Sequence, residues 1–319
     1  MGSSAPAGVE GILEGSVLVG CALYRVVFEG DLYFEGFSYK PFKSLVALGS
    51  SVLGAIPPGP SLEVSASPLI EAPAGGPGRI LGTWRPGWLM EWRGPRGGVR
   101  IGGGGSYYLR VSWVGPSGED RARALGEALE AASGLARVEL VEWGLERVEA
   151  PFTHEALLAL ASPAQFKIVG WDGLERVLSH PDPARLLAAP LKALNPPPDA
   201  AREARAALNL YTAQTGGEWR RVTVYIDRRR PTNWALTGWA RLTLTRQAPE
   251  WAGRLLGLLQ RLALYTGVGK SRLEGLGLAG EPLDPKNKPE LLKAPCMPWP
   301  LKAAGPSSGG SEANAPGRA

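Results

Sequence analysis

The sequence of 319 residues predicts an α+β fold made of two tandem ferredoxin-like units. Three observations support this prediction. The first half alternates strand and helix patterns in the order β-α-β-β-α-β, the second half repeats that order, and the length leaves room for about two domains of ordinary size. An apolar fraction of 44% is sufficient for packed cores, so a globally disordered chain is excluded.

The first unit is expected to span residues 1–150, with extra strand material inserted. Its strand patterns are rich in Val, Leu and Tyr, and its helix patterns repeat apolar residues at helical spacing. The second helix also carries acidic residues in its first turn. The predicted strands lie at 16–28, 61–67, 84–92, 106–114 and 137–148, and the predicted helices at 40–53 and 119–132.

The second unit is expected to span residues 151–300. A boundary near 149–154 is compatible with both halves. The tail, residues 301–319, has few apolar residues and is expected to be disordered. The predicted strands lie at 157–168, 219–226, 234–244 and 276–283, and the predicted helices at 173–194, 200–212 and 250–265.

Several classes of protein are disfavoured by composition. No run of 18 apolar residues is present, which disfavours a transmembrane helix, and the start lacks the pattern of a secretory signal, so we expect a cytoplasmic protein. Cys21 and Cys296 form no CxxC pair, so we expect neither a zinc cluster nor a disulfide framework. His154 and His180 are the only histidines, too few for a site built on several of them, and we expect structural roles for both.

Charge is distributed unevenly along the chain. Residues 1–150 carry 13 Lys and Arg against 16 Asp and Glu, a net charge of −3, whereas residues 151–319 carry 22 against 14, a net charge of +8. A basic half of this kind is typical of proteins that bind phosphate or nucleic acid. The alternative is the solvated surface of an arginine-rich protein.

A glycine-rich stretch at 265–280 includes the letters GVGKS, which suggest a phosphate-binding loop. That motif requires a glycine at position 264, which is Leu264, and the third glycine of a dinucleotide fingerprint would fall on Arg272. The stretch also follows a predicted helix rather than a strand, so neither motif is supported. Glycine backbone with Lys270 and Arg272 would still suit an anion. The alternative is a turn that returns the chain to a sheet.

The same stretch resembles a family signature. A helix ending in an aromatic residue, then G-[VI]-G-[KR]-x-x-x-x-G-x-G, then a short strand, is similar to the C-terminal signature of the CRISPR-associated RAMP endoribonucleases, the sixth Cas family. Ser162 and Pro163 followed by Phe166 resemble the motif that opens that family's second domain. Asp182–Pro183 with the leucines that follow, and residues 237–244, are also similar. The resemblance covers about 150–283 and is only architectural before that.

This resemblance implies two RRM-like RAMP domains and a metal-independent endoribonuclease that needs no cofactor. In that family the 2′-hydroxyl beside the scissile bond attacks the phosphorus, which leaves a 2′,3′-cyclic phosphate and a 5′-hydroxyl. The reaction needs a base, charge stabilisation and an acid for the leaving oxygen. The implied partners are CRISPR repeat RNA, its crRNA product and other Cas effector subunits, with the protein a monomer or homodimer.

Many members of the family carry a histidine near the first helix, but residues 20–60 contain none, as in histidine-poor archaeal-type members. Tyr39, Lys40 and Lys43 stand at the start of the predicted first helix instead. The resemblance makes the two lysines candidates for charge stabilisation and proton donation, and Tyr39 a candidate base. A lysine is a poor base at neutral pH but a good electrostatic clamp. The alternatives are solvated lysines and a tyrosine that serves only in packing.

The expected RNA contacts are mostly basic residues and glycines of the second half. They bracket a predicted hairpin, follow the Ser-Pro motif or lie in the glycine stretch. The candidates are Lys167, Arg220, Arg228, Arg229, Arg230, Gly267, Gly269, Lys270, Ser271, Arg272, Gly275 and Gly277.

Two other functions remain open. A non-catalytic RAMP subunit that binds crRNA inside a CRISPR effector complex would agree with the missing histidine. An unrelated basic binding protein would make the glycine stretch coincidental.

Overall fold

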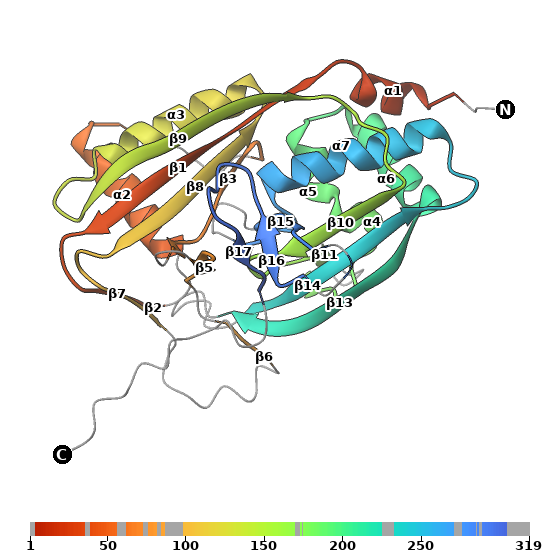
Figure 1. Cartoon of the computed structure of the whole chain (residues 1–319). Coiled ribbons are helices and arrows are strands. Elements are labelled where there is room, and N and C mark those ends of the chain that lie inside the picture. The colour runs from red at the N-terminus through yellow and green to blue at the C-terminus, as the bar shows by residue number, and fades with distance from the viewer. Residues whose placement is uncertain are drawn as a thin grey trace.

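The computed structural model describes residues 4–35, 39–55, 62–72, 76–81, 84–86, 98–169, 173, 175–224, 233–270, 276–284, 286 and 289–304. Within these residues the chain forms two large antiparallel sheets with helices packed against them (Figure 1). The predicted α+β fold of tandem ferredoxin-like units is confirmed. The end points of the two predicted domains are still a prediction.

The first sheet has β1 at its centre, paired antiparallel with β8 and β9. Its spatial order is β5-β4-β8-β1-β9, with β3 also on β8, which is the strand order of a ferredoxin-like unit. Helices α2 and α3 cover one face (Figure 1). The elements are β1 (Val17–Phe28), α2 (Tyr39–Val52), β3 (Val64–Ala66), β4 (Ile70–Glu71), β5 (Arg79–Ile80), β8 (Ser106–Val114), α3 (Pro116–Glu130) and β9 (Ala136–Val148).

The second sheet repeats this plan, with β15-β10-β14-β13 in the equivalent order. Strands β16 and β17 extend one edge. At the other edge β13 pairs with β6, a strand from the first half of the sequence. The elements are β6 (Trp84–Pro86), β10 (Glu155–Leu160), α4 (Pro183–Leu186), α5 (Ala188–Ala193), α6 (Pro198–Tyr211), β13 (Thr212–Val224), β14 (Asn233–Leu244), α7 (Glu250–Thr266), β15 (Ala279–Pro282), β16 (Leu291–Lys293) and β17 (Leu301–Lys302).

Helix α7 contacts strands of both sheets. Its leucines belong to one core cluster that also contains Val19 and Val114 of the first sheet and Leu158 and Leu160 of the second. The apolar residues cover a broad face of the helix, and its acidic first residue, Glu250, suits the positive end of the helix dipole. The two halves of the chain therefore share a hydrophobic core built around α7.

Small elements complete the described structure. Helix α1 (Ala7–Leu13) was not predicted, and it lies on α6 and α7 of the second half (Figure 1). The contact is close, because a Cβ on Gly8 would lie 2.8 Å from the Cα of Ala200. Two small two-stranded sheets pair β2 (Leu32–Glu35) with β7 (Gly98–Ile101), and β11 (Lys167–Val169) with β12 (Glu175–Val177).

The predicted helix at 173–194 is wrong over its first part. Residues 175–177 form β12, and α4 begins only at Pro183. The reason is local: the Asp182 side chain accepts a hydrogen bond from the backbone N–H of Arg185, which caps a helix at that point. Strand β13 also starts earlier than predicted, directly after α6, because Thr212–Val224 pairs with β14 along its whole length.

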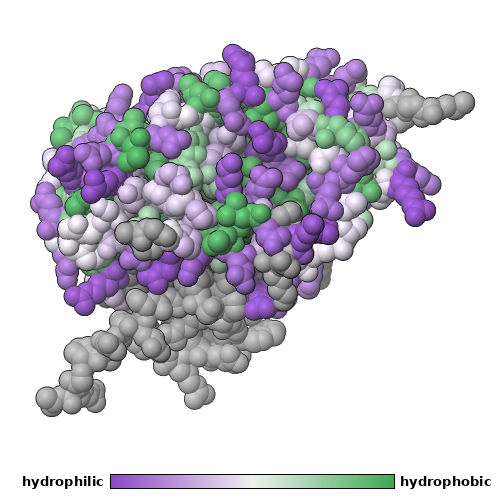
Figure 2. All heavy atoms as spheres, in the orientation of Figure 1, coloured by the Kyte–Doolittle hydropathy of each residue, from purple (hydrophilic) through white to green (hydrophobic). Residues whose placement is uncertain are grey.

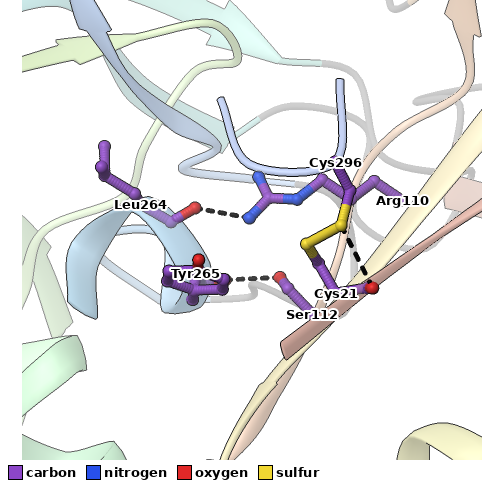
Figure 3. Close-up of a disulfide and its surroundings, with 6 residues drawn as sticks. All are labelled: Cys21, Arg110, Ser112, Leu264, Tyr265 and Cys296. Carbon is purple, nitrogen blue, oxygen red and sulfur yellow. Dashed lines mark hydrogen bonds between the residues drawn. A yellow bond between two sulfur atoms is a disulfide. The ribbon is translucent and has the colours of Figure 1, made fainter. Parts of the chain in front are cut away.

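The expectation that the cysteines form no disulfide is wrong. Cys21 on β1 and Cys296 after β16 are joined by a disulfide (Figure 3). The two residues are 275 positions apart, and they meet only because the C-terminal strands return to the first sheet. The bond therefore ties the end of the second sheet to the centre of the first.

Within the described residues no helix is long and apolar enough to cross a membrane. Figure 2 shows a face covered mainly by hydrophilic residues, with hydrophobic ones in small scattered groups. Such groups are ordinary on a folded surface.

We predict that the variant Cys21→Ala/Cys296→Ala unfolds with a free energy lower by about 2–5 kcal/mol, because a link across so long a loop restricts the unfolded chain. Chemical denaturation of the oxidised protein and the variant would measure the difference. Reductant should lower the midpoint of the wild type and leave the variant unchanged. Two free thiols in the denatured, unreduced wild type would contradict the prediction.

Candidate nucleic-acid interface

The Ser-Pro segment, residues 161–166, is hydrogen-bonded to both arms of the glycine loop, residues 267–278. Ser162 Oγ accepts a bond of 2.9 Å from the N–H of Leu278, and the Pro163 carbonyl accepts one of 2.8 Å from Gly277. On the other arm, the Gln165 carbonyl accepts a bond of 2.8 Å from Lys270. The two motifs singled out from the sequence therefore form one structural unit.

Three glycines of this loop are required by the protein's own backbone. Gly267, Gly269 and Gly277 have φ of +67°, +77° and +75°, a region that favours glycine. A Cβ on Gly277 would lie 1.8 Å from the carbonyl oxygen of Val268, and one on Gly269 would lie 2.6 Å from that of Gln165. These glycines therefore allow the close approach of the protein's own backbone, and their role toward an anion stays a prediction.

Five backbone donors of the loop are also used internally. The N–H of Gly267 bonds Ala263, that of Val268 bonds Gly277, and those of Lys270, Gly277 and Leu278 bond the Ser-Pro segment. A donor that already has a partner is not available to cradle a phosphate. These five donors are therefore not available to an anion, and the basic side chains beside the loop are the candidates for binding one.

Basic side chains gather beside the loop. A pocket of about 80 Å³ is lined by Lys167 and Lys270, both predicted from the sequence, and by Arg185, which was not. Lys270 and Arg185 are exposed, and Lys167 is half-buried. The remaining lining residues are Gln165, Phe166, Ala188, Ala189 and Gly269. Nothing in the sequence around Arg185 marks it, because the other two cations of the pocket come from other segments.

The other predicted RNA contacts are scattered or not described. Arg220 is exposed on β13, and its Nε donates to Glu218 at 2.6 Å, so its charge is partly compensated. Six candidates lie outside the described residues: Arg228, Arg229, Arg230, Ser271, Arg272 and Gly275.

The predicted catalytic residues stand at the start of α2, as expected. Lys40 is half-buried, Lys43 is exposed, and Tyr39 is the first residue of the helix, with its side chain outside the described part. Helix α2 packs on α3 over the first sheet. These residues and the basic pocket thus belong to different halves of the chain.

The end of α7, from which the glycine loop departs, is fixed to the first sheet (Figure 3). Arg110 Nη2 on β8 donates a bond of 2.5 Å to the carbonyl of Leu264, and Ser112 Oγ donates one of 2.5 Å to that of Tyr265. The last carbonyls of a helix have no partner within it, and a cation there is favoured by the helix dipole. Sequence analysis missed both residues.

Burial shapes the electrostatics at this junction. It lowers the pKa of the Arg110 guanidinium to about 10, so the side chain remains charged at neutral pH. Burial also raises the pKa of Tyr265, and a hydrogen bond with Glu146 raises it further, so the hydroxyl remains protonated. Glu146 in turn lies 3.6 Å from Arg261. The junction is a polar network that runs from the buried Arg110 to the exposed pair Glu146 and Arg261.

Both histidines are exposed in the second half of the chain. The ring of His154 contacts Phe152, with 4.6 Å between centroids. Among the described residues, no group of three or more His, Cys, Asp or Glu side chains is placed to hold a metal ion.

No family model and no curated protein matches the sequence. The structure, however, has a tandem ferredoxin-like fold, and it is similar over most of its length to solved structures of Cas6 proteins. Cas6 (TTHB231) in a product complex aligns with a TM-score of 0.53 and 19% identity, over 83% of this chain and 99% of that one. Cas6 (TTHA0078) in a product complex aligns with a TM-score of 0.50 and 20% identity, over 82% and 98%. Thermus thermophilus Cas6 (TTHB231) aligns with a TM-score of 0.50 and 17% identity, over 83% and 98%.

We predict that Gly277→Ala lowers the thermal midpoint more than Gly134→Ala. Both glycines have positive φ, which costs an alanine about 1–3 kcal/mol, but only Gly277 also meets backbone, whereas a Cβ on Gly134 meets nothing within 4 Å. Differential scanning fluorimetry of the two variants would measure this. Equal midpoints would show that the loop tolerates a side chain there.

Proposed function

We propose that the protein is a metal-independent endoribonuclease that cleaves CRISPR repeat RNA through attack by a 2′-hydroxyl. The products would be a 2′,3′-cyclic phosphate end and the guide crRNA. The observation that carries this proposal is the likeness to Cas6 (TTHB231), solved as a product complex, over 83% of this chain and 99% of that one. The basic pocket beside the glycine loop supports it, because a substrate of this kind is polyanionic.

Lys40 and Lys43 are proposed to stabilise the charge of the phosphorane and to protonate the leaving 5′-oxygen, with Tyr39 as the base. An ammonium group held at a helix start is a fixed positive charge beside the reacting phosphate, which is where negative charge accumulates in the transition state. Lys43 is exposed and therefore accessible to RNA, and Lys40 is half-buried, which restricts its motion.

The RNA is proposed to bind through Lys167, Lys270 and Arg220, together with Ser271, Arg272 and Arg228–Arg230. Gly267, Gly269, Gly275 and Gly277 are proposed to serve the interface by shaping the loop that carries Lys270. In this proposal the protein works in the cytoplasm, as a monomer or homodimer, alone or with other Cas effector subunits.

A second candidate is a RAMP subunit that binds crRNA without cutting it. One observation favours it: residues 20–60 contain no histidine, and both histidines of the sequence are in the second half. Many members of the family that the sequence resembles carry a histidine near the first helix.

The deciding experiment is a cleavage assay in EDTA with a CRISPR repeat RNA and a twin substrate that is 2′-deoxy at the cut nucleotide. The enzyme should cut the first and leave the second intact. Tight binding without cleavage of either substrate would favour the non-catalytic subunit. Absence of binding to the repeat RNA at moderate salt would reject both.

We predict that Lys40→Ala and Lys43→Ala each lower the single-turnover cleavage rate by about 100-fold or more, while affinity for the uncleavable twin changes far less. The reason is that proton transfer and charge stabilisation act in the transition state rather than in the bound ground state.

The matched control is Lys302→Ala, which removes an exposed lysine of β17. Its cleavage rate should equal that of the wild type. If the two α2 variants cut as fast as this control, the lysines have no part in the chemistry.

A further inference from the structure

The pocket beside the glycine loop is lined by three cations from three separate segments. Lys167 begins β11, Arg185 lies in α4, and Lys270 belongs to the glycine loop. No aspartate or glutamate is among the described residues that line it. Three cationic side chains around one hollow favour an anion there, and Asp182, which pairs with Arg185 beside the pocket, compensates part of that charge.

The size of the pocket suits a small anion. Its volume of about 80 Å³ is roughly half that of a cavity of ~150 Å³ known to accommodate a benzene ring. A phosphate group is small enough to enter it. Phe166, Ala188 and Ala189 supply apolar wall, which suits the edge of the ribose that adjoins a phosphate.

The pocket is held by the surrounding structure. Phe166 is 3% exposed and Ala189 is 5% exposed, so this wall is anchored in the core. The Gln165 carbonyl fixes the backbone of Lys270, and Asp182 holds the guanidinium of Arg185 through Nη1. A guanidinium has five donors, so the bond to Asp182 leaves others for a ligand. The site is thus largely formed before any ligand binds.

We propose that this pocket holds one backbone phosphate of the bound RNA, and that Arg185 is its third cation. The proposal rests on the proposed function, since it assumes that the protein binds RNA. It adds a residue that the sequence did not indicate, and it locates a phosphate contact at the junction of α4, β11 and the glycine loop.

The test is the salt dependence of binding to a non-cleavable, 2′-deoxy-blocked repeat RNA. Replacing a cation that neutralises one phosphate lowers the slope of log K against log salt concentration by about 0.7–0.9. We expect that decrease for Arg185→Ala, together with weaker binding at low salt. Arg185→Lys, which keeps the charge, should retain the slope of the wild type.

The matched control is Arg202→Ala. Arg202 lies on α6 and pairs with Asp199 at 2.7 Å three positions away, the same spacing as Arg185 and Asp182, but it is not among the residues lining the pocket. Each alanine variant therefore releases one aspartate and removes one exposed arginine. The slope for Arg202→Ala should equal that of the wild type.

The outcomes separate the two proposals. If wild type binds the RNA and Arg185→Ala shows the same slope as Arg202→Ala, the pocket proposal is wrong and the proposed function stands. The same conclusion follows if Arg185→Lys loses as much slope as Arg185→Ala. If wild type does not bind repeat RNA at all, the proposed function itself fails. Thermal midpoints of the variants would verify that all are folded.

Discussion

The attachment of α7 to the first sheet is the constraint on which the rest of the structure depends. Its last carbonyls bond to Arg110 and Ser112 of the first sheet, and its leucines pack on strands of both sheets. A fully buried guanidinium is costly to desolvate, and within the described part of the chain Arg110 Nε and Nη1 have no hydrogen-bond partner. The helix carbonyls and the negative end of the helix dipole offset part of that cost. Because Arg110 would lose this partner if α7 moved, the two halves are held in one arrangement.

The position of the glycine loop depends on this attachment of α7. It leaves α7 at Gly267 and is then bonded on both arms to the Ser-Pro segment. Its glycines serve the protein's own backbone, since they permit positive φ and the close approach of Val268 and Gln165. A glycine-rich sequence is often interpreted as a flexible cradle for phosphate, but here the described arms of the loop are bonded to the protein's own backbone, and one of them presents a lysine.

Local patterns predicted the fold well, and long-range contacts account for what they missed. Strand β8 has the predicted bounds and α7 ends one residue later than predicted, because alternation and helical spacing are properties of neighbouring residues. The partner of Arg110 is 154 positions away and that of Cys21 is 275 away, so neither role leaves a local signal. Lys167 and Lys270 were proposed from their motifs, whereas Arg185 shares their pocket only through the fold of α4.

Under the proposed function, the different net charges of the two halves imply different roles for the basic residues of the second half and for Lys40 and Lys43 of the first. The second half, with net charge +8, can supply the sequence-independent attraction that holds a polyanion. The first half has net charge −3 and repels one, so Lys40 and Lys43 add little to overall affinity. Under the proposed function, Lys40 and Lys43 would act over short range, on the phosphate at the cut site. In that case the junction at α7 fixes the distance between the RNA-binding second half and the proposed catalytic lysines of the first half. A change at this junction would alter the cut position before it altered the affinity for RNA.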